Sequence, residues 1–337
     1  MQYLHEFLLN FIFCCYQASG AGKSTLLDVL ANRKTTGEIR GKVLFDGEER
    51  SIATNRSSAY VMQDNIHIAV LTVRQTLTYA AHLRMPETVS LKEKNIRINK
   101  VLDLLGLTSH ENDIVGNEII RGLSGGQVKR LSIGVEIINL PTCIFLDEPT
   151  TGLDSSIAYE VIFAIRNLAN QQRTIICTIH QPSTKIYAML DKLLLLAHGR
   201  VIYYGPAKMA VGYFVSSPFA YAFVRGSNPS DFIISVAGSF LADSKGRFVS
   251  GDELADFYSK TEMSKTFGEN ITTVLNIDRV SKKVTALSND YNESNGYITS
   301  TWYQINVLMN RAFYRTIKEL KPALGAAFRL VHILFGT

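Results

Sequence analysis

The stretch Gly20-Ala21-Gly22-Lys23-Ser24-Thr25 constrains the fold more than any other part of this sequence, and the apolar pair Leu26-Leu27 follows it directly. Glycines let a backbone wrap closely around an anion, so that several N–H groups point inward. A helix starting here adds the positive end of its dipole. The pattern predicts a phosphate-binding loop in which Lys23 reaches the β- and γ-phosphates and Ser24 holds Mg²⁺. A glycine-rich turn before an ordinary helix is the alternative.

The loop departs from its pattern at one position. Gln17 stands where the motif G-x-x-x-x-G-K-[ST] begins with glycine, whereas residues 18–24, Ser19 among them, are intact. Glutamine adopts such a turn at some conformational cost. We therefore expect the loop to be well formed where it meets phosphate and poorly formed where it leaves the preceding strand.

Composition narrows the class of protein. A chain of 337 residues with 46% hydrophobic and 19% charged residues is expected to bury a substantial core in one large or two ordinary domains. A formal charge of +5 is too mild to indicate nucleic-acid binding. Two of the four cysteines, Cys143 and Cys177, lie in apolar runs, which predicts reduced core thiols of a cytosolic domain.

Residues 1–16 are mostly apolar and precede the loop. A signal peptide would need a basic start and a cleavage site, and a membrane span would need a longer run. We favour a buried strand, because phosphate-binding loops follow a strand. A segment outside the native coding sequence is a further alternative, which Gln17 makes plausible.

Strand-like and helix-like stretches alternate after the loop. Strands are expected at 37–46, with a tight turn at Asp46-Gly47, at 59–62, at 143–146 and at 174–179. Helices are expected after Thr72 as N-cap, over 91–106 and over 155–170. This order predicts a parallel sheet with helices on its faces and an all-helical insert between its two halves.

Polar residues follow three of the expected strands, and a parallel sheet places such residues at one ligand-binding edge. Asp147 there suits the coordination shell of Mg²⁺, and Glu148 suits a general base for the attacking water. Gln63 would contact both the metal ion and that water, and His180 would donate to the γ-phosphate. A solvated turn is the alternative for the carboxylate pair.

A second anion site is expected at another helix start, where Ser124, Gly125 and Gly126 expose backbone donors before Gln127. One chain then carries two half-sites for one kind of ligand. A head-to-tail pair of chains would complete each phosphate loop with the partner's Ser-Gly-Gly. Asp154 would lie near that shared interface.

Taken in order, these motifs resemble the nucleotide-binding domain of an ABC transporter. The finer resemblance, to subfamily G (the white and pleiotropic-drug-resistance type), rests on residues 124–136, 145–156, 178–183 and 228–232. It covers residues 18–240 strongly and 300–337 more loosely.

The resemblance implies an α/β P-loop NTPase fold of the RecA-like kind, with an α-helical signature subdomain and a C-terminal helical extension. It implies ATP and Mg²⁺ as ligands and hydrolysis coupled to transport by a dimer. The implied catalytic residues are Glu148, His180 and Gln63, and the implied metal-binding residues are Ser24, Gln63 and Asp147. The implied nucleotide-binding residues are Ser19, Gly20, Ala21, Gly22, Lys23, Ser24, Thr25, Ser124, Gly125, Gly126, Gln127 and Asp154.

The expected division follows the same resemblance. It comprises an atypical apolar segment (1–17), the nucleotide-binding domain (18–210), a helical extension and linker (211–300), an amphipathic connecting helix (301–321) and the start of a first transmembrane helix (322–337). In the connecting helix, Ile305, Leu308, Met309, Ala312 and Phe313 share one face. That face suits either packing within the domain or the cytoplasmic surface of a membrane.

The expected partners are a second nucleotide-binding domain, identical or different, a transmembrane domain and a membrane, but no nucleic acid. The family carries antiparallel strands before the phosphate loop and membrane helices after the domain, so the chain is expected to be truncated at both ends. Two alternatives remain. One is a non-hydrolysing remnant or interaction fragment, and the other is a soluble ABC ATPase of the DNA-repair or translation type.

Overall fold

The computed structural model describes residues 12–16, 22–45, 48–49, 51–266, 268 and 298–335. Contacts divide the chain into two compact units. The first comprises Met1–Asp64 and Leu140–Asn289, and the second comprises Asn65–Asn139 and Asp290–Thr337. The helical segment between the two halves of the first unit confirms the predicted all-helical insert.

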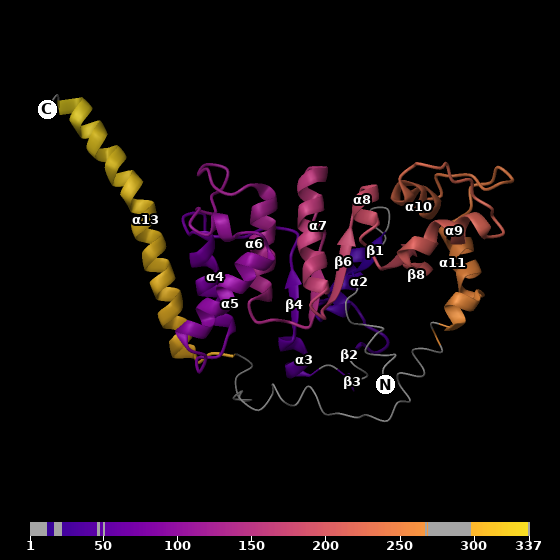
Figure 1. The fold of residues 1–337 in the computed structure, drawn as a ribbon, viewed down its shortest axis with the longest axis horizontal. Coiled ribbons are helices and arrows are strands. Elements are labelled where there is room, and N and C mark those ends of the chain that lie inside the picture. The colour runs from indigo at the N-terminus through magenta and orange to yellow at the C-terminus, as the bar shows by residue number, and fades with distance from the viewer. Residues whose placement is uncertain are drawn as a thin grey trace. The chain divides into compact units, whose positions relative to one another are not determined.

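The first unit contains a parallel sheet and the helices that cover it (Figure 1). Its strands are β1 (Ile12–Tyr16), β2 (Leu44–Phe45), β3 (Glu48–Glu49), β4 (Ser58–Val61), β5 (Cys143–Leu146), β6 (Thr174–Ile179), β7 (Lys192–Ala197) and β8 (Arg200–Pro206). Its helices are α2 (Lys23–Leu30), α3 (Ile52–Arg56), α7 (Ser155–Ala169), α8 (Thr184–Tyr187), α9 (Ala210–Ser216), α10 (Pro229–Ala237) and α11 (Gly251–Ser259), with a 3₁₀ turn at Ala207–Met209.

The sheet has the strand order β4-β5-β6-β1-β7-β8. All neighbours are parallel except β7 and β8, which pair in antiparallel fashion. The predicted strand before the phosphate loop is therefore confirmed as β1, and it lies in the middle of the sheet. Cys15 of β1 is the register partner of Thr178 on one side and of Leu194 on the other.

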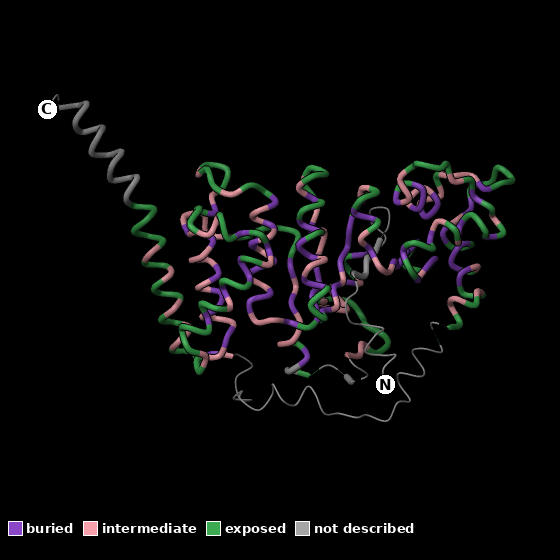
Figure 2. Tube along the Cα trace, viewed as in Figure 1, coloured by how far each residue is buried: buried purple, intermediate pink, exposed green. Residues whose placement is uncertain are grey.

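Strand β5 shows why this sheet needs cover on both faces. All four of its residues are buried, as expected when helices lie on both sides of a parallel sheet. Leu27 of α2 is fully buried and packs in one cluster with Cys143 and Phe145. Burial is densest along the strands and the inner sides of the helices (Figure 2).

One predicted element differs from the structure. The expected strand over 37–46 is reduced to β2, which pairs with the short β3, and the residues before it are irregular. Gly37 and Gly41 adopt φ values of 91° and 107°, which interrupt an extended conformation. The predicted turn at Asp46-Gly47 lies outside the described residues.

The second unit is helical in the residues that the structure describes. It contains α4 (Val73–Arg84), α5 (Leu91–Leu104), α6 (Gly125–Ile137) and α13 (Thr301–Phe335), with a 3₁₀ turn at Thr108–His110. The predicted N-cap is confirmed, because the Thr72 hydroxyl accepts from the Gln75 amide while the Gln75 side chain bonds back to the Thr72 amide. Gly134 allows close packing, since a Cβ there would lie 3.0 Å from Leu105.

Helix α13 is 35 residues long and continues through the expected boundary at residue 321. Three of its polar side chains bond to α4, namely Tyr303 to His82, Asn310 to Tyr79 and Tyr314 to Gln75. Several apolar residues of α13 stay exposed in this chain, including Trp302, Ile305, Met309 and Phe313. Over the described part of the chain, we find no helix with the length and apolar character needed to cross a bilayer.

Candidate functional site

The N-terminus of α2 forms the first part of the site. Gly22 precedes the helix at φ 101°, and a Cβ built there would meet nothing within 4 Å. Glycine supplies no capping side chain, so the first amides of α2 can turn to an anion. Lys23 is buried at the helix start, whereas Ser24 and Thr25 are exposed. Ser19, Gly20 and Ala21, together with Gln17, lie outside the described residues.

Asp147 is the centre of the second part, directly after β5. Its Oδ1 accepts from Ser24 Oγ at 3.1 Å and from Thr178 Oγ1 at 2.7 Å. Its Oδ2 lies 3.4 Å from the hydroxyl of Tyr60, which also donates to Asp28 at 2.9 Å. The Asp147 carboxylate therefore joins α2 to the ends of three neighbouring strands.

The period of two along a strand explains this convergence. Tyr60, Phe145 and Ile176 pack in the same cluster as Leu27, so they face α2. Residues two positions further along a strand point to the same side. Asp147 follows Phe145 by two, and Thr178 follows Ile176 by two, so both emerge beneath the N-terminal turn of α2.

Glu148 lies next to this group and adopts φ 43°, in the left-handed region. Its Oε2 accepts from Gln63 Nε2 at 3.3 Å and from Thr151 Oγ1 at 2.8 Å. Its backbone N–H donates to Thr178 Oγ1 at 2.8 Å. The structure thus brings four of the predicted site residues, Ser24, Gln63, Asp147 and Glu148, into one hydrogen-bonded group.

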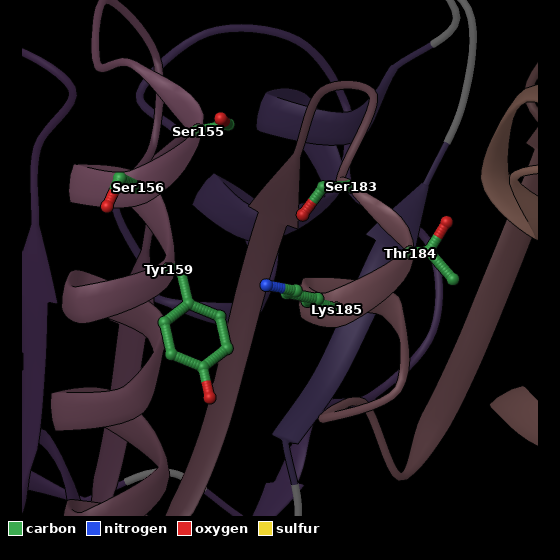
Figure 3. A pocket seen from close by; sticks show the side chains of 6 residues that line it. All are labelled: Ser155, Ser156, Tyr159, Ser183, Thr184 and Lys185. Atoms are coloured by element: carbon green, nitrogen blue, oxygen red, sulfur yellow. The ribbon is translucent and has the colours of Figure 1, made fainter.

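His180 follows β6 and is exposed. A surface pocket of about 400 Å³ has Ser155, Ser156 and Tyr159 of α7 on one side and Ser183, Thr184 and Lys185 on the other (Figure 3). The carboxylate of Asp154 caps α7, accepting from the amides of Ser156 and Ile157. This predicted interface residue therefore also has a role in stabilising its own helix.

Ser124, Gly125, Gly126 and Gln127 belong to the second unit, where they open α6. The Ser124 hydroxyl accepts from the Gln127 amide, and Gln127 Oε1 accepts from the Ser124 amide at 2.8 Å. The side-chain nitrogen of Gln127 lies 3.0 Å from His110 Nε2, and His110 Nδ1 lies 2.7 Å from Asp113. The helix start predicted as a second anion site is therefore built as a capping box.

Sequence reasoning did not single out Tyr60 or Thr178. Burial raises the pKa of Tyr60 well above its usual value, and the hydrogen bond to Asp28 and the charge of Asp147 add to this effect. The phenol therefore stays a proton donor. Thr178 carried a signal in the sequence, because it is a hydroxyl within the otherwise apolar run Ile175 to Ile179.

Comparisons with known proteins give the family and the fold of this chain. Residues 18–151 match the family model described as ABC transporter, and residues 180–312 match the one described as ABC-2 type transporter. A solved nucleotide-free ATP-binding cassette from an ABC transporter superimposes with a TM-score of 0.51 at 21% identity. That alignment covers 62% of this chain and 85% of the other, and it confirms the predicted P-loop NTPase fold.

Curated relatives give the subfamily. The pig protein "Broad substrate specificity ATP-binding cassette transporter ABCG2" is 37% identical over 336 residues, which cover 94% of this chain and 50% of the relative. The cattle protein of the same name is 43% identical over 244 residues, which cover 72% of this chain and 36% of the relative. "ABC transporter G family member 14" of Arabidopsis thaliana is 36% identical over 298 residues, which cover 87% of this chain and 45% of the relative.

The chain spans about half the length of the pig protein. The ABC-transporter match includes the sequence of the phosphate loop and the carboxylates after β5, which the structure joins through Ser24 and Asp147. The chain therefore belongs to subfamily G of the ABC transporter family and carries that family's ATP-binding, ATP-hydrolysing domain.

Proposed function

We propose that this chain hydrolyses ATP at the site built around Asp147 and that, as part of a longer transporter, it couples hydrolysis to export across a membrane. The observation that carries the proposal is the hydrogen-bonded group of Ser24, Gln63, Asp147 and Glu148 at the carboxyl ends of the strands. Parallel sheets bind ligands at this edge.

We assign phosphate binding to residues 19–25. Ser19, Gly20, Ala21 and Gly22 would wrap the phosphates, Lys23 would pair with the β- and γ-phosphates, and Thr25 would line the helix start. The open space at the Gly22 Cα supports this role, because a backbone can approach an anion closely only where no Cβ intervenes.

The residues present also suit Mg²⁺. Ser24 and Asp147 bring a hydroxyl and a carboxylate oxygen within 3.1 Å of each other, and Gln63, whose side-chain nitrogen donates to Glu148, also carries an amide oxygen. Oxygen ligands of this kind are those that Mg²⁺ prefers. When bound, the ion would neutralise charge that develops on the phosphates.

We assign the general base to Glu148. Its carboxylate is held by Gln63 and Thr151, and both bonds leave Oε1 for a water molecule. Gln63 would orient that water, and His180, exposed at the next strand end, would donate to the γ-phosphate.

We further propose that two such domains, identical or different, act head to tail. The capped helix start at Ser124, Gly125, Gly126 and Gln127 would then face the phosphates bound by the partner domain, and Asp154 would lie at the shared interface. Anion binding at a helix N-terminus supports the first assignment.

The C-terminal part is proposed to lead to the membrane. The exposed apolar residues of α13, among them Met309 and Phe313, suit an amphipathic helix at the cytoplasmic surface of a bilayer. We keep the division into 1–17, 18–210, 211–300, 301–321 and 322–337 as a functional one. The nucleotide-binding domain would then lie on the cytoplasmic side.

A Glu148→Gln variant of the full chain tests the proposal. We expect it to bind ATP with Mg²⁺ about as tightly as the parent but to lose turnover by at least roughly a hundredfold. Glu262→Gln, which alters an exposed pair with Lys265, is the matched control and should hydrolyse normally. Activity per chain should rise with protein concentration if dimers are the active form. Unchanged turnover in Glu148→Gln would refute the assignment, and absent nucleotide binding by the parent would favour the non-hydrolysing remnant.

A further inference from the structure

We propose that Thr178 is a positioning residue that holds Asp147 and Glu148 in their working arrangement and ties them to the strand that carries His180. The inference rests on the proposed function of these carboxylates. It adds a residue that does not touch the substrate but acts through those that do.

The Thr178 hydroxyl bonds to both neighbours at once. It donates to Asp147 Oδ1 at 2.7 Å, and it accepts from the backbone N–H of Glu148 at 2.8 Å. A hydroxyl has one proton and two lone pairs, so the two bonds do not compete. The bond to Asp147 is charge-assisted, which makes it stronger than a bond between neutral groups.

The burial of Thr178 means that water cannot replace its hydroxyl in these two hydrogen bonds. Thr178 is fully buried, with 0% of its surface exposed. If the hydroxyl were removed, water could not simply take its place on the Glu148 amide. A buried polar group left without its partner bears the full cost of desolvation.

The hydrogen bond from the Glu148 amide to Thr178 also helps to hold Glu148 in an unfavourable backbone conformation. Glu148 has φ 43°, and L-residues with a side chain rarely adopt the left-handed region. This conformation turns the Glu148 side chain toward Gln63 and Thr151. The Thr178 hydroxyl holds the amide at the start of this turn and so helps to fix the direction of the carboxylate.

The position of Thr178 on β6 also places it next to β1 and close to His180 in the chain. Thr178 is the register partner of Cys15 in β1, the strand that leads toward the phosphate loop. It also precedes His180 by two residues on β6. One residue thus joins the carboxylates, the strand of the phosphate loop and the strand of the histidine.

The test compares Thr178→Val, which keeps the shape but removes the hydroxyl, with Thr178→Ser, which keeps the hydroxyl. In the valine variant we expect kcat to fall roughly 10- to 100-fold, while ATP affinity without Mg²⁺ changes less than about twofold. The serine variant should stay within about fivefold of the parent. Exchange of the Glu148 amide hydrogen with solvent should be at least about tenfold faster in Thr178→Val than in the parent.

Thr174→Val is the matched control, because it makes the same change at the start of the same strand, four residues away from Thr178. It should leave kcat and the Glu148 amide unaffected. If the valine variant does not fold, Thr178→Ala and Thr178→Ser form a second pair that differs only in the hydroxyl, and the alanine variant should be the slower by the same factor.

The outcomes separate the two proposals. A parent chain that binds ATP but does not hydrolyse it would defeat the proposed function. An active parent with a folded Thr178→Val variant of equal kcat would overturn this inference alone. A serine variant as slow as the valine variant would overturn it as well, because the methyl group rather than the hydroxyl would then be what matters.

Discussion

The hydroxyl of Ser24 donates to a carboxylate oxygen of Asp147 at 3.1 Å, although the two residues lie 123 positions apart in the chain. This bond joins the first turn of α2 to the end of β5. The two oxygens lie close enough for one cation to contact both with little rearrangement.

Replacing Ser24 by alanine should therefore raise the Mg²⁺ concentration that gives half-maximal turnover by at least about tenfold, because one oxygen ligand is lost. The measurement is an ATPase titration with Mg²⁺ at saturating ATP. Ser259→Ala removes a hydroxyl that bonds to the Asp256 carbonyl on α11, and it should not shift the titration. A Ser24→Ala titration that overlays the parent's would contradict the assignment of Ser24.

Tyr60→Phe should destabilise the first unit by about 1 to 2 kcal/mol, because the half-buried carboxylates of Asp28 and Asp147 lose a shared donor. Thermal unfolding followed by calorimetry measures this. Since the pKa of Tyr60 is raised, the phenol stays protonated and the difference should hold across roughly pH 6 to 9. Tyr159→Phe, at an exposed position of α7, is the control. Equal unfolding temperatures for Tyr60→Phe and the parent would show that the bond is not stabilising.

Gly122→Ala should destabilise the second unit by about 1 to 3 kcal/mol, because a Cβ would lie 2.4 Å from the Val115 carbonyl oxygen and 2.6 Å from Gly116 Cα. Backbone atoms cannot move aside as a flexible side chain can. Hydrogen exchange over residues 115–124 reports the effect locally. Gly212→Ala in α9 meets no atom within 4 Å and should be neutral or slightly stabilising. Slow exchange in Gly122→Ala would indicate that the loop repacks.

Stability should fall as the pH drops below about 6.5, partly through His67. Burial, and then the positive charge of Lys129, lowers the pKa of His67 from 6.5. Between the folded and unfolded pKa values of His67, the unfolded chain binds more protons than the folded chain. The free energy of unfolding therefore rises with pH in that window, and the contribution of neutral His67 to stability is complete above about pH 6.5. His67→Gln should flatten the profile there, whereas His198→Gln, at an exposed position, should not. A His67→Gln profile as steep as the parent's would exclude this histidine as the cause.

The strands and helices of the core followed from local patterns in the sequence. Phe145 and Leu146 before Asp147, and Ile175 to Ile179 before His180, are buried runs that end in polar residues, and both proved to be parallel strands. Thr72 also proved to cap its helix as predicted. Each of these features depends on residues close together in the chain.

The site residues that the sequence did not predict depend on contacts between residues far apart in the chain. The role of Tyr60 needs the register of β4 against β5, which places it beside Phe145 and below Asp28. The role of Thr178 needs the left-handed turn at Glu148, which no residue type signals. The irregular segment after Gly37 shows the converse case, since two glycines with positive φ outweigh a local pattern that predicted a strand.

The position of β1 has a consequence for the order of events during synthesis. Its two neighbours in the sheet, β6 and β7, begin at Thr174 and Lys192. At about 5 to 20 residues per second, a ribosome takes roughly 10 to 40 s to pass from Tyr16 to the end of β7. During that time the apolar residues 12–16 have no sheet to join. In a nascent chain, residues 12–16 should therefore depend on chaperones until β6 and β7 have been synthesised, and the phosphate loop should be completed only after that.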